Sequence, residues 1–272
     1  MTGERAVTAM QEYYARGEEA DRLAKSGPGQ LEFERTREIV LRHLPPAPAV
    51  IADIGGGPGR YALWLAGLGY RVVHRDVMPL HVEQLAAAAG PGVAIESAVG
   101  DARSIDLADA SVDAVLLLGP LYHLERRTER VRVLGEARRI VRPGGPVFGA
   151  AISRWAARYD AILRLRLYEQ FPAILDAVGP LERSGVIPPL EPGWFTAYTH
   201  RPGQLRAEFT SAGFAVADLV SVECGAYLLP DLAERMADPV AREVIMDTAR
   251  ALERVPELIG LGSHLLATGQ RP

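Results

Sequence analysis

The sequence predicts an α/β fold in which helices cover both faces of a mostly parallel sheet. Short apolar runs alternate with segments of helical periodicity between residues 50 and 152, and this alternation is typical of parallel strands joined by crossover helices. The first apolar run ends in a group of glycines, which is typical of a strand that leads into a ligand-binding turn. With 272 residues, 48% of them hydrophobic, the chain is long enough to bury one substantial core.

The expected elements follow one another in a regular order. Strands are expected at residues 50–54, 71–75, 93–97, 112–118 and 147–152, with helices at 61–68, 80–89 and 125–141. Farther on, the pattern indicates a helix at 203–212, a strand at 214–222, a mostly helical stretch at 229–255 and a final strand at 264–268.

Two segments outside this alternation are expected to cover the sheet. Residues 1–44 carry apolar side chains at helical spacing, with a break at 26–29, and the prolines of 45–48 form a stiff connector. Residues 153–201 combine helical stretches with many aromatic residues and prolines. We therefore expect a single domain, 1–272, with an N-terminal helical cap at 1–44 and a helical lid insertion at 153–201.

The composition argues against several functional classes. The formal charge is −4 and the isoelectric point about 5.9, so we expect no nucleic-acid partner. The single cysteine, Cys224, can form neither an internal disulfide nor a thiolate metal cage. No run approaches the roughly 20 apolar residues of a membrane span, and the N-terminus lacks the apolar core of a signal peptide. We expect a cytoplasmic protein without a membrane partner.

The most informative segment is the glycine loop that follows the first strand. Gly55, Gly57 and Gly59 allow a sharp turn and a close approach of the backbone to a ligand. A dinucleotide fingerprint needs a further glycine where Arg60 stands. Asp53, just before the loop, would repel a pyrophosphate but attract an ammonium group. The loop therefore favours a ligand with a cationic end and no phosphate.

The series Asp53-x-Gly55-x-Gly57-x-Gly59 resembles motif I of the class I S-adenosylmethionine (SAM)-dependent methyltransferases. The resemblance is strong over residues 45–152 and includes Ala212-Gly213-Phe214 before a later strand. It implies a Rossmann-like sheet of seven strands with the last one antiparallel. It also implies SAM as the cofactor, S-adenosylhomocysteine as its product, and a small molecule as the methyl acceptor.

The resemblance assigns residues to the adenosine part of SAM. Asp76, at the end of the second strand, would accept the ribose hydroxyls, and Val77 and Met78 would flank the adenine. Asp101 would receive the exocyclic amine of the adenine, and Ala102 would supply a backbone contact. The alternatives are that Asp76 caps the next helix and that Asp101 bonds only its own backbone.

Other residues are assigned to the methionine part and to the acceptor. The backbone of Leu118 and Gly119 would meet the methionine, and Arg35 would reach its carboxylate unless it forms a surface salt bridge. His123 is the candidate general base or acceptor-orienting group, with a plain hydrogen bond to the lid as the alternative. Tyr122 lies beside it, and Tyr14 is expected near the sulfonium; both have packing as the alternative.

The predicted lid supplies candidate substrate residues. Their aromatic faces and polar groups suit an aromatic or prenyl-like metabolite of secondary metabolism. They equally suit a small helical subdomain with its own core. The candidates are Arg158, Tyr159, Trp194, Tyr198 and His200. No His-Glu-x-x-His, Cys-x-x-Cys or carboxylate triad is present in the sequence, so no metal is expected.

Other functions remain open at this stage. One alternative is an enzyme of the same class that acts on RNA or protein, although the acidic balance argues against RNA. A SAM-binding cyclase or regulator would use the cofactor without methyl transfer. An NAD-dependent oxidoreductase would need the glycine spacing that this loop lacks. The sequence is compatible with a monomer or a homodimer.

Overall fold

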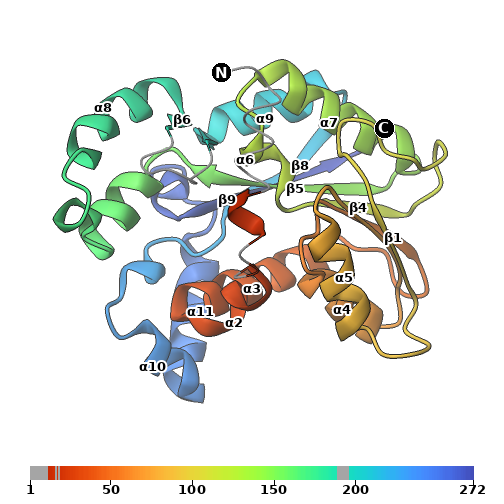
Figure 1. The fold of residues 1–272 in the computed structure, drawn as a ribbon, viewed down its shortest axis with the longest axis horizontal. Coiled ribbons are helices and arrows are strands. Elements are labelled where there is room, and N and C mark those ends of the chain that lie inside the picture. The colour runs from red at the N-terminus through yellow and green to blue at the C-terminus, as the bar shows by residue number, and fades with distance from the viewer. Residues whose placement is uncertain (1–11, 16, 18, 189–195) are drawn as a thin grey trace.

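A mostly parallel sheet runs through the centre of the computed structural model, which describes residues 12–15, 17, 19–188 and 196–272 (Figure 1). Its first five strands lie in the order β3-β2-β1-β4-β5, and all of their pairings are parallel. Their bounds are β1 Val50–Ile54, β2 Arg71–Asp76, β3 Ile95–Val99, β4 Ala114–Leu117 and β5 Pro146–Ser153. The parallel sheet predicted from the alternating pattern is confirmed.

The far edge of the sheet is closed by the last strands of the chain. β9 (His264–Gln270) pairs antiparallel to β5 along its whole length, and β8 (Ala215–Ser221) pairs antiparallel to β9. Together with the first five strands these make the seven that the sequence predicts, with the last one antiparallel. The Rossmann-like architecture is therefore confirmed.

Two further strands were not predicted. β7 (Ala197–His200) pairs parallel to the end of β5, with Ile152 opposite Thr199, and β6 (Val186–Ile187) pairs antiparallel to β7. Because β9 occupies one edge of β5, β7 follows the other edge beyond the end of β4. The prediction of a purely helical insertion at 153–201 is therefore wrong at its C-terminal end, which belongs to the sheet.

Helices cover both faces of the sheet. On one face, α3 (Gly27–Leu41), α4 (Arg60–Gly67) and α5 (Pro79–Ala88) bury apolar side chains such as Ile39, Leu65 and Leu85. On the other face, α7 (Arg127–Ile140) and α9 (Pro202–Ser211) bury side chains such as Leu134 and Phe209. α6 (Pro120–His123) is a single turn after β4.

Two helices of the N-terminal cap, both within the described residues 19–44, meet at a capped break. α2 (Glu19–Lys25) ends just before Ser26, whose hydroxyl accepts the N–H of Gly29 at 3.1 Å and so caps α3. α3 packs on α10 (Leu232–Ala237), and α11 (Pro239–Leu252) lies beside them (Figure 1). Leu31 of α3 shares a third apolar cluster with residues of α10 and α11.

Short helices follow β5 before the sheet resumes. They are η1 (Ala157–Arg164), η2 (Leu167–Glu169) and α8 (Ile174–Ser184). Two further single turns lie between β8 and β9: η3 (Ala226–Leu228) follows β8, and η4 (Ile259–Leu261) precedes β9. η1 is a π-helix, a form that is rare over eight residues. Among the described residues, no helix is long and apolar enough to cross a membrane.

Candidate active site

A cavity lies where the carboxyl ends of β1, β2 and β4 meet, the edge at which open α/β sheets bind ligands. It gathers residues that the sequence assigned separately to donor binding and to catalysis. Those that line it are Tyr14, Gly55, Gly57, Asp76, Val77, Met78, Asp101, Ala102, Leu118, Gly119, Tyr122 and His123. Gly59 lies outside its wall, packed on Leu85.

The glycine loop shows why its glycines are needed. Gly55 has φ +66°, and a Cβ there would lie 2.5 Å from Pro120 Cγ. Gly57 has φ +58° and no heavy atom within 4 Å of the position of a Cβ, so its backbone borders open space. Both backbone polar groups of Gly57 are hydrogen-bonded to side chains. The N–H of Gly57 donates to Asp76 Oδ2 at 2.8 Å, and its carbonyl accepts from His74 Nε2 at 3.0 Å.

Asp53 lies beneath this loop rather than on the cavity wall. Its side chain is fully buried, and a Cβ on Gly56 would lie 2.5 Å from Asp53 Oδ2. Neither carboxylate oxygen has a hydrogen-bond partner within the described part of the chain. Burial and the nearby charge of Asp76 raise the pKa of Asp53 to about 7. Asp53 does not line the cavity, so its expected attraction for an ammonium group would act across the loop.

Asp76 ends β2 as an ionised carboxylate on the cavity wall. Its Oδ1 accepts the N–H of Met78 at 2.9 Å and bonds His81 Nδ1 at 2.9 Å. Burial alone would raise the pKa of Asp76, but the hydrogen bonds from His81, Met78 and Gly57 outweigh it and lower the pKa below its ordinary value. The helix-capping alternative is thus met in part, since the N–H of Met78 precedes α5. The same carboxylate still borders the cavity.

Asp101 both lines the cavity and bonds the backbone two residues farther along the chain. It lines the cavity, with 40% of its side chain exposed, and its Oδ1 accepts the N–H of Arg103 at 2.8 Å. The Arg103 guanidinium pairs with the same carboxylate at 2.6 Å. Desolvation opposes ionisation of Asp101, but these bonds outweigh it and lower the pKa. A carboxylate with exposed lone pairs remains available at the position expected for the adenine amine.

Two catalytic candidates that are far apart in the sequence meet in the cavity. Tyr14 Oη lies 3.1 Å from His123 Nε2, and the two rings contact edge to face with centroids 5.6 Å apart. Tyr122 packs on His123 from the other side at 4.7 Å. Burial lowers the pKa of His123 to about 4 and raises that of Tyr14. Both groups are therefore neutral near pH 7, joined by a hydrogen bond that the sequence alone did not predict.

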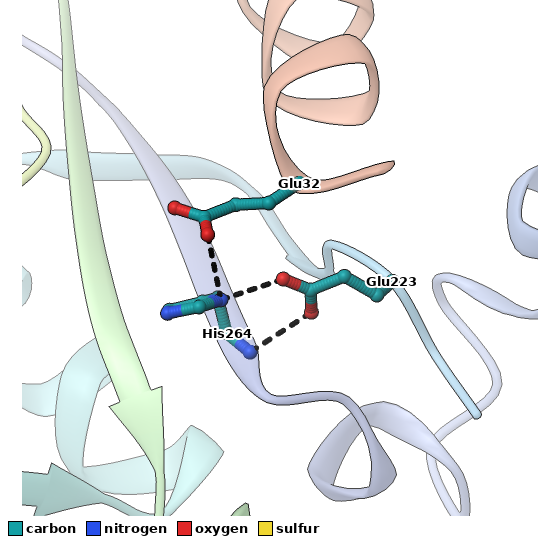
Figure 2. A group of neighbouring side chains, drawn as sticks. All are labelled: Glu32, Glu223 and His264. Atoms are coloured by element: carbon teal, nitrogen blue, oxygen red, sulfur yellow. Dashed lines mark hydrogen bonds and ion pairs between the residues drawn. The ribbon is translucent and has the colours of Figure 1, made fainter. Parts of the chain in front are cut away.

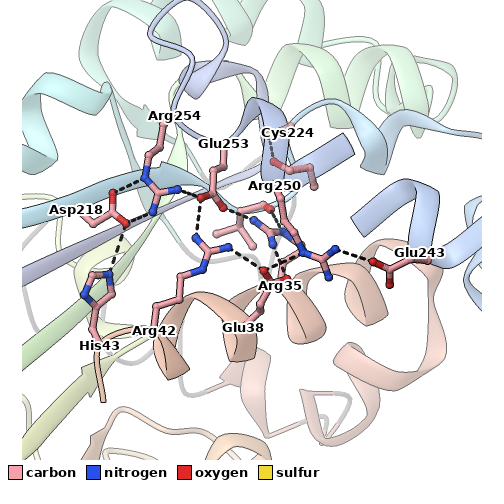
Figure 3. A network of polar contacts seen from close by, with 12 residues as sticks. Arg35, Glu38, Arg42, His43, Asp218, Cys224, Glu243, Arg250, Glu253 and Arg254 are labelled. Atoms are coloured by element: carbon pink, nitrogen blue, oxygen red, sulfur yellow. Dashed lines mark hydrogen bonds and ion pairs between the residues drawn. The ribbon is translucent and has the colours of Figure 1, made fainter. Parts of the chain in front are cut away.

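Arg35 does not reach the cavity, and its predicted role as the carboxylate ligand is not supported. Its guanidinium is fully buried between α3 and the end of α11 (Figure 3). It pairs with Glu253, pairs with Glu38 at 2.7 Å, and donates from Nε to the carbonyl of Val222 at 3.2 Å. These partners use its donors within the core. A buried, fully paired arginine is a structural element.

Arg22 is one of four arginines that line the cavity, with Arg60, Arg103 and Arg126, and sequence reasoning missed it. It bonds Glu32 through two nitrogens, at 2.6 and 3.0 Å. Glu32 in turn lies 3.9 Å from His264 Nδ1, which pairs with Glu223 at 2.6 Å (Figure 2). Burial lowers the pKa of His264, but the two glutamates outweigh it and raise the pKa to about 9.

This group alternates positive and negative charges from the cavity to β9. Glu32, Glu223 and His264 are close enough to hold a metal ion. In this structure the raised pKa of His264 favours a protonated imidazole that pairs with Glu223, and Arg22 neutralises Glu32. The group therefore balances its own charges and fixes Arg22 in the cavity wall. Arg22 bonds Glu19 of its own helix at 2.7 Å and Glu32 of α3. The local sequence pattern could not show that Arg22 faces the cavity, because Glu32 is itself placed beside His264 of β9.

The predicted substrate residues of the insertion lie away from the cavity. Tyr198 and His200 are buried on β7, where Arg130 lies 3.7 Å from the centre of the Tyr198 ring. His200 Nε2 lies 3.1 Å from Glu208, which also pairs with Arg130. Their assignment to substrate is corrected to a role in the core, because β7 joins the sheet.

The other members of this set are placed differently. Arg158 is exposed and paired with Glu182 at 2.6 Å, and Tyr159 packs on the third apolar cluster. Neither lines the cavity. Trp194 lies outside the described residues. Tyr159 thus packs against residues outside the insertion, so the third apolar cluster is not a separate core of residues 153–201.

Known proteins agree with the fold and with the glycine-loop region. Residues 52–149 match the family model of a methyltransferase domain. A ubiquinone/menaquinone biosynthesis C-methyltransferase of Acidiphilium cryptum is 34% identical over 122 residues, which are 43% of this chain and 48% of that protein. The chain thus matches about half of the length of this relative.

Solved structures extend the likeness over most of the chain. A SAM-dependent methyltransferase of Methanosarcina mazei has a TM-score of 0.58 and 20% identity, covering 86% of this chain and 96% of that one. A [4+2]-cyclase has a TM-score of 0.55 and 18% identity, covering 88% and 81%. The chain therefore has the fold of the class I SAM-dependent methyltransferases, and residues 52–149 match the model of a methyltransferase domain.

Proposed function

We propose that this chain transfers the methyl group of SAM to a small-molecule acceptor. The observation that carries the proposal is the meeting of donor-binding and catalytic candidates in one cavity. The glycine loop with Asp76 and Asp101 forms one side, and the Tyr14–His123 pair lies at the other. The residues fit the cofactor, because the space beside Gly57 is open and the Asp76 carboxylate is ionised beside it.

The residues of the cavity divide the work of binding. SAM supplies an electrophilic methyl group on a sulfonium. Asp76 and Asp101 offer carboxylate oxygens to the ribose and the adenine, with Val77 and Met78 along the adenine and Ala102 beside it. Leu118 and Gly119 border the methionine side. Arg22 is the cation for the methionine carboxylate, since charge-assisted pairing of a guanidinium with a carboxylate is strong and directional.

The Tyr14–His123 pair orients the acceptor. With a pKa of about 4, His123 is a weak base. It therefore holds the acceptor by a hydrogen bond and does not keep a proton taken from the acceptor. Tyr14 Oη and His123 Nε2 lie 3.1 Å apart, which fixes the imidazole ring. Most of the rate enhancement then comes from alignment of donor and acceptor and from exclusion of water.

The choice of a small acceptor rests on charge and on the rings of the cavity. The formal charge of −4 and the acidic residues at the cavity, Glu19, Glu125 and Glu129, oppose a polyanionic RNA substrate. Tyr14 and Tyr122 offer aromatic faces that suit an aromatic or prenyl-like compound of secondary metabolism. We extend the proposal to a cytoplasmic enzyme, monomeric or homodimeric, without a nucleic-acid or membrane partner.

The proposal is tested in two steps with the full chain. Isothermal titration calorimetry should detect binding of SAM and S-adenosylhomocysteine and none of NAD. Incubation with methyl-labelled SAM and a panel of phenols, amines and prenyl compounds should then release S-adenosylhomocysteine with at least one acceptor. Absence of binding by both sulfur ligands contradicts the proposal. Binding without label transfer, together with conversion of an acceptor, indicates a cyclase that keeps SAM intact.

A further inference from the structure

The hydrogen-bond capacity of Asp76 is almost used up by the protein. A carboxylate oxygen has two lone pairs in the plane of the group. Asp76 Oδ1 already has two partners, the N–H of Met78 and His81 Nδ1, both at 2.9 Å. Asp76 Oδ2 accepts the N–H of Gly57 at 2.8 Å and keeps one position. In this arrangement Asp76 can receive one hydroxyl of a ribose, while a ribose diol offers two.

A second polar atom lies next to it on the same cavity wall. His81 is 3% exposed and lines the cavity, with its Nδ1 on Asp76 Oδ1. Since a carboxylate can only accept, Nδ1 carries the hydrogen, and in the neutral ring Nε2 has a lone pair. Within the described part of the chain, His81 Nε2 is buried without a hydrogen-bond partner. Buried polar atoms without partners are uncommon and call for an explanation.

The surroundings of His81 suit a ribose. The Tyr14 ring lies edge-on to the His81 ring at 5.3 Å, so His81 stands between Asp76 and the Tyr14–His123 pair. The ribose of SAM lies between its adenine and its sulfonium. His81 therefore adjoins both Asp76, which is proposed for the ribose, and Tyr14, which is proposed to lie near the sulfonium.

We propose that the ribose diol of the donor is shared between Asp76 and His81, with one hydroxyl on Asp76 Oδ2 and the other on His81 Nε2. The proposal rests on the proposed binding of SAM, and it does not depend on whether the methyl group is transferred. It makes His81 a binding residue and not only a support for Asp76.

The matched variants are His81→Asn and His81→Phe. The Asn amide nitrogen replaces Nδ1 and keeps a donor for Asp76, but Asn has no atom at the position of Nε2. Phe keeps the ring and removes both nitrogens. The probes are S-adenosylhomocysteine and its 2′-deoxy and 3′-deoxy analogues, measured by calorimetry on the full chain. Each variant is compared by the ratio of affinities for the three ligands, which does not depend on the folded fraction.

The wild-type chain should bind each deoxy analogue about tenfold more weakly than the parent, because each analogue leaves one acceptor unpaired. In His81→Asn, one of the two ratios should fall to about one while the other stays near tenfold. If both ratios stay at the wild-type value in His81→Asn, the proposal is wrong. If both fall together, His81 acts only through Asp76, which also overturns it. A wild-type chain that binds none of the three ligands contradicts the proposed function itself.

Discussion

Two buried carboxyl groups on opposite sides of the glycine loop are driven to different protonation states. Asp53 has no hydrogen-bond partner among the described residues, and its pKa rises to about 7. Asp76 accepts three hydrogen bonds, and its pKa falls. The difference follows from partners rather than from burial, since both side chains are buried. One of the two is thus a fixed negative charge, and the other titrates near neutral pH.

The affinity for a ligand with an ammonium group should depend on Asp53. Below pH 7 Asp53 takes up a proton and its attraction for the ammonium is lost, whereas above pH 7 it is ionised. Affinity for S-adenosylhomocysteine should therefore rise with pH through about 7, by up to about tenfold per unit below that value. Calorimetry across this range checks it. Asp53→Asn should remove the dependence, and methylthioadenosine, which lacks the ammonium, should not show it.

The hydroxyl of Tyr14 offers a second test at this scale. Tyr14→Phe keeps the ring beside His81 and His123 and removes the oxygen that lies 3.1 Å from His123 Nε2. We expect kcat to fall by about 10- to 100-fold, because an acceptor-orienting group is lost, with little change in affinity for S-adenosylhomocysteine. Initial rates and calorimetry measure the two quantities. Unchanged kcat would show that Tyr14 serves only packing.

The sequence correctly predicts which residues border the cavity where those residues lie at the end of a strand. Asp76 and Gly57 follow strands directly, and parallel strands bring their carboxyl ends to one edge. Sequence reasoning failed for Arg35 and Arg22, which lie on neighbouring cap helices. Glu253, far along the chain, pairs with Arg35 in the core, and Glu32 holds Arg22 at the cavity. Whether Arg22 or Arg35 faces the cavity therefore depends on partners that lie outside the helix of each arginine.

At the scale of elements, the two cap helices carry one arginine each. Arg35 on α3 is expected to stabilise the fold, whereas Arg22 on α2 is expected to bind the ligand. Arg35 joins α3 to the end of α11, within a network that includes Arg42, Glu253 and Arg254 (Figure 3). Arg22 on α2 faces the cavity. The two helices are joined by the short Ser26 break. Matched substitutions can assign each arginine to its element.

Arg35→Met and Arg22→Met form this matched pair. Arg35→Met should lower the free energy of unfolding by about 2 kcal/mol, because the buried Glu253 loses one of its arginine partners and the Val222 carbonyl loses its donor. Its affinity for S-adenosylhomocysteine should be unchanged. Arg22→Met should weaken that affinity by about tenfold or more through loss of a charge-assisted contact. Denaturant unfolding and calorimetry are the measurements. An affinity loss in Arg35→Met would restore the original assignment of Arg35.

The strands show which elements can be predicted and which cannot. Seven strands carry apolar runs of their own, and all seven are present. β7 spans only Ala197–His200, and its pairing with β5 spans residues far apart in the sequence. β6 has two residues, too few for any periodicity. Their strand character comes from the extension of β5 beyond β4, a tertiary effect that overrides local propensity.

At the scale of the whole molecule, one sheet supplies both main apolar clusters. The first cluster contains Ala52 and Leu117, and the second contains Ile51 and Leu116 of the same two strands. Alternate side chains of a strand point to opposite faces, so neither cluster can unfold without exposing the other. The third cluster is tied to the second through α3, whose Leu31 and Ile39 belong to different clusters.

The chain should therefore unfold in one cooperative transition that a donor ligand shifts as a whole. At a concentration of S-adenosylhomocysteine 100 times its dissociation constant, binding should stabilise the folded state by about 2.7 kcal/mol. For a domain of this size the midpoint should then rise by about 5 °C. Differential scanning calorimetry with and without ligand measures both. Two separate transitions, of which the ligand shifts only one, would show that the cap or the insertion folds as an independent unit and that the cavity belongs to the other.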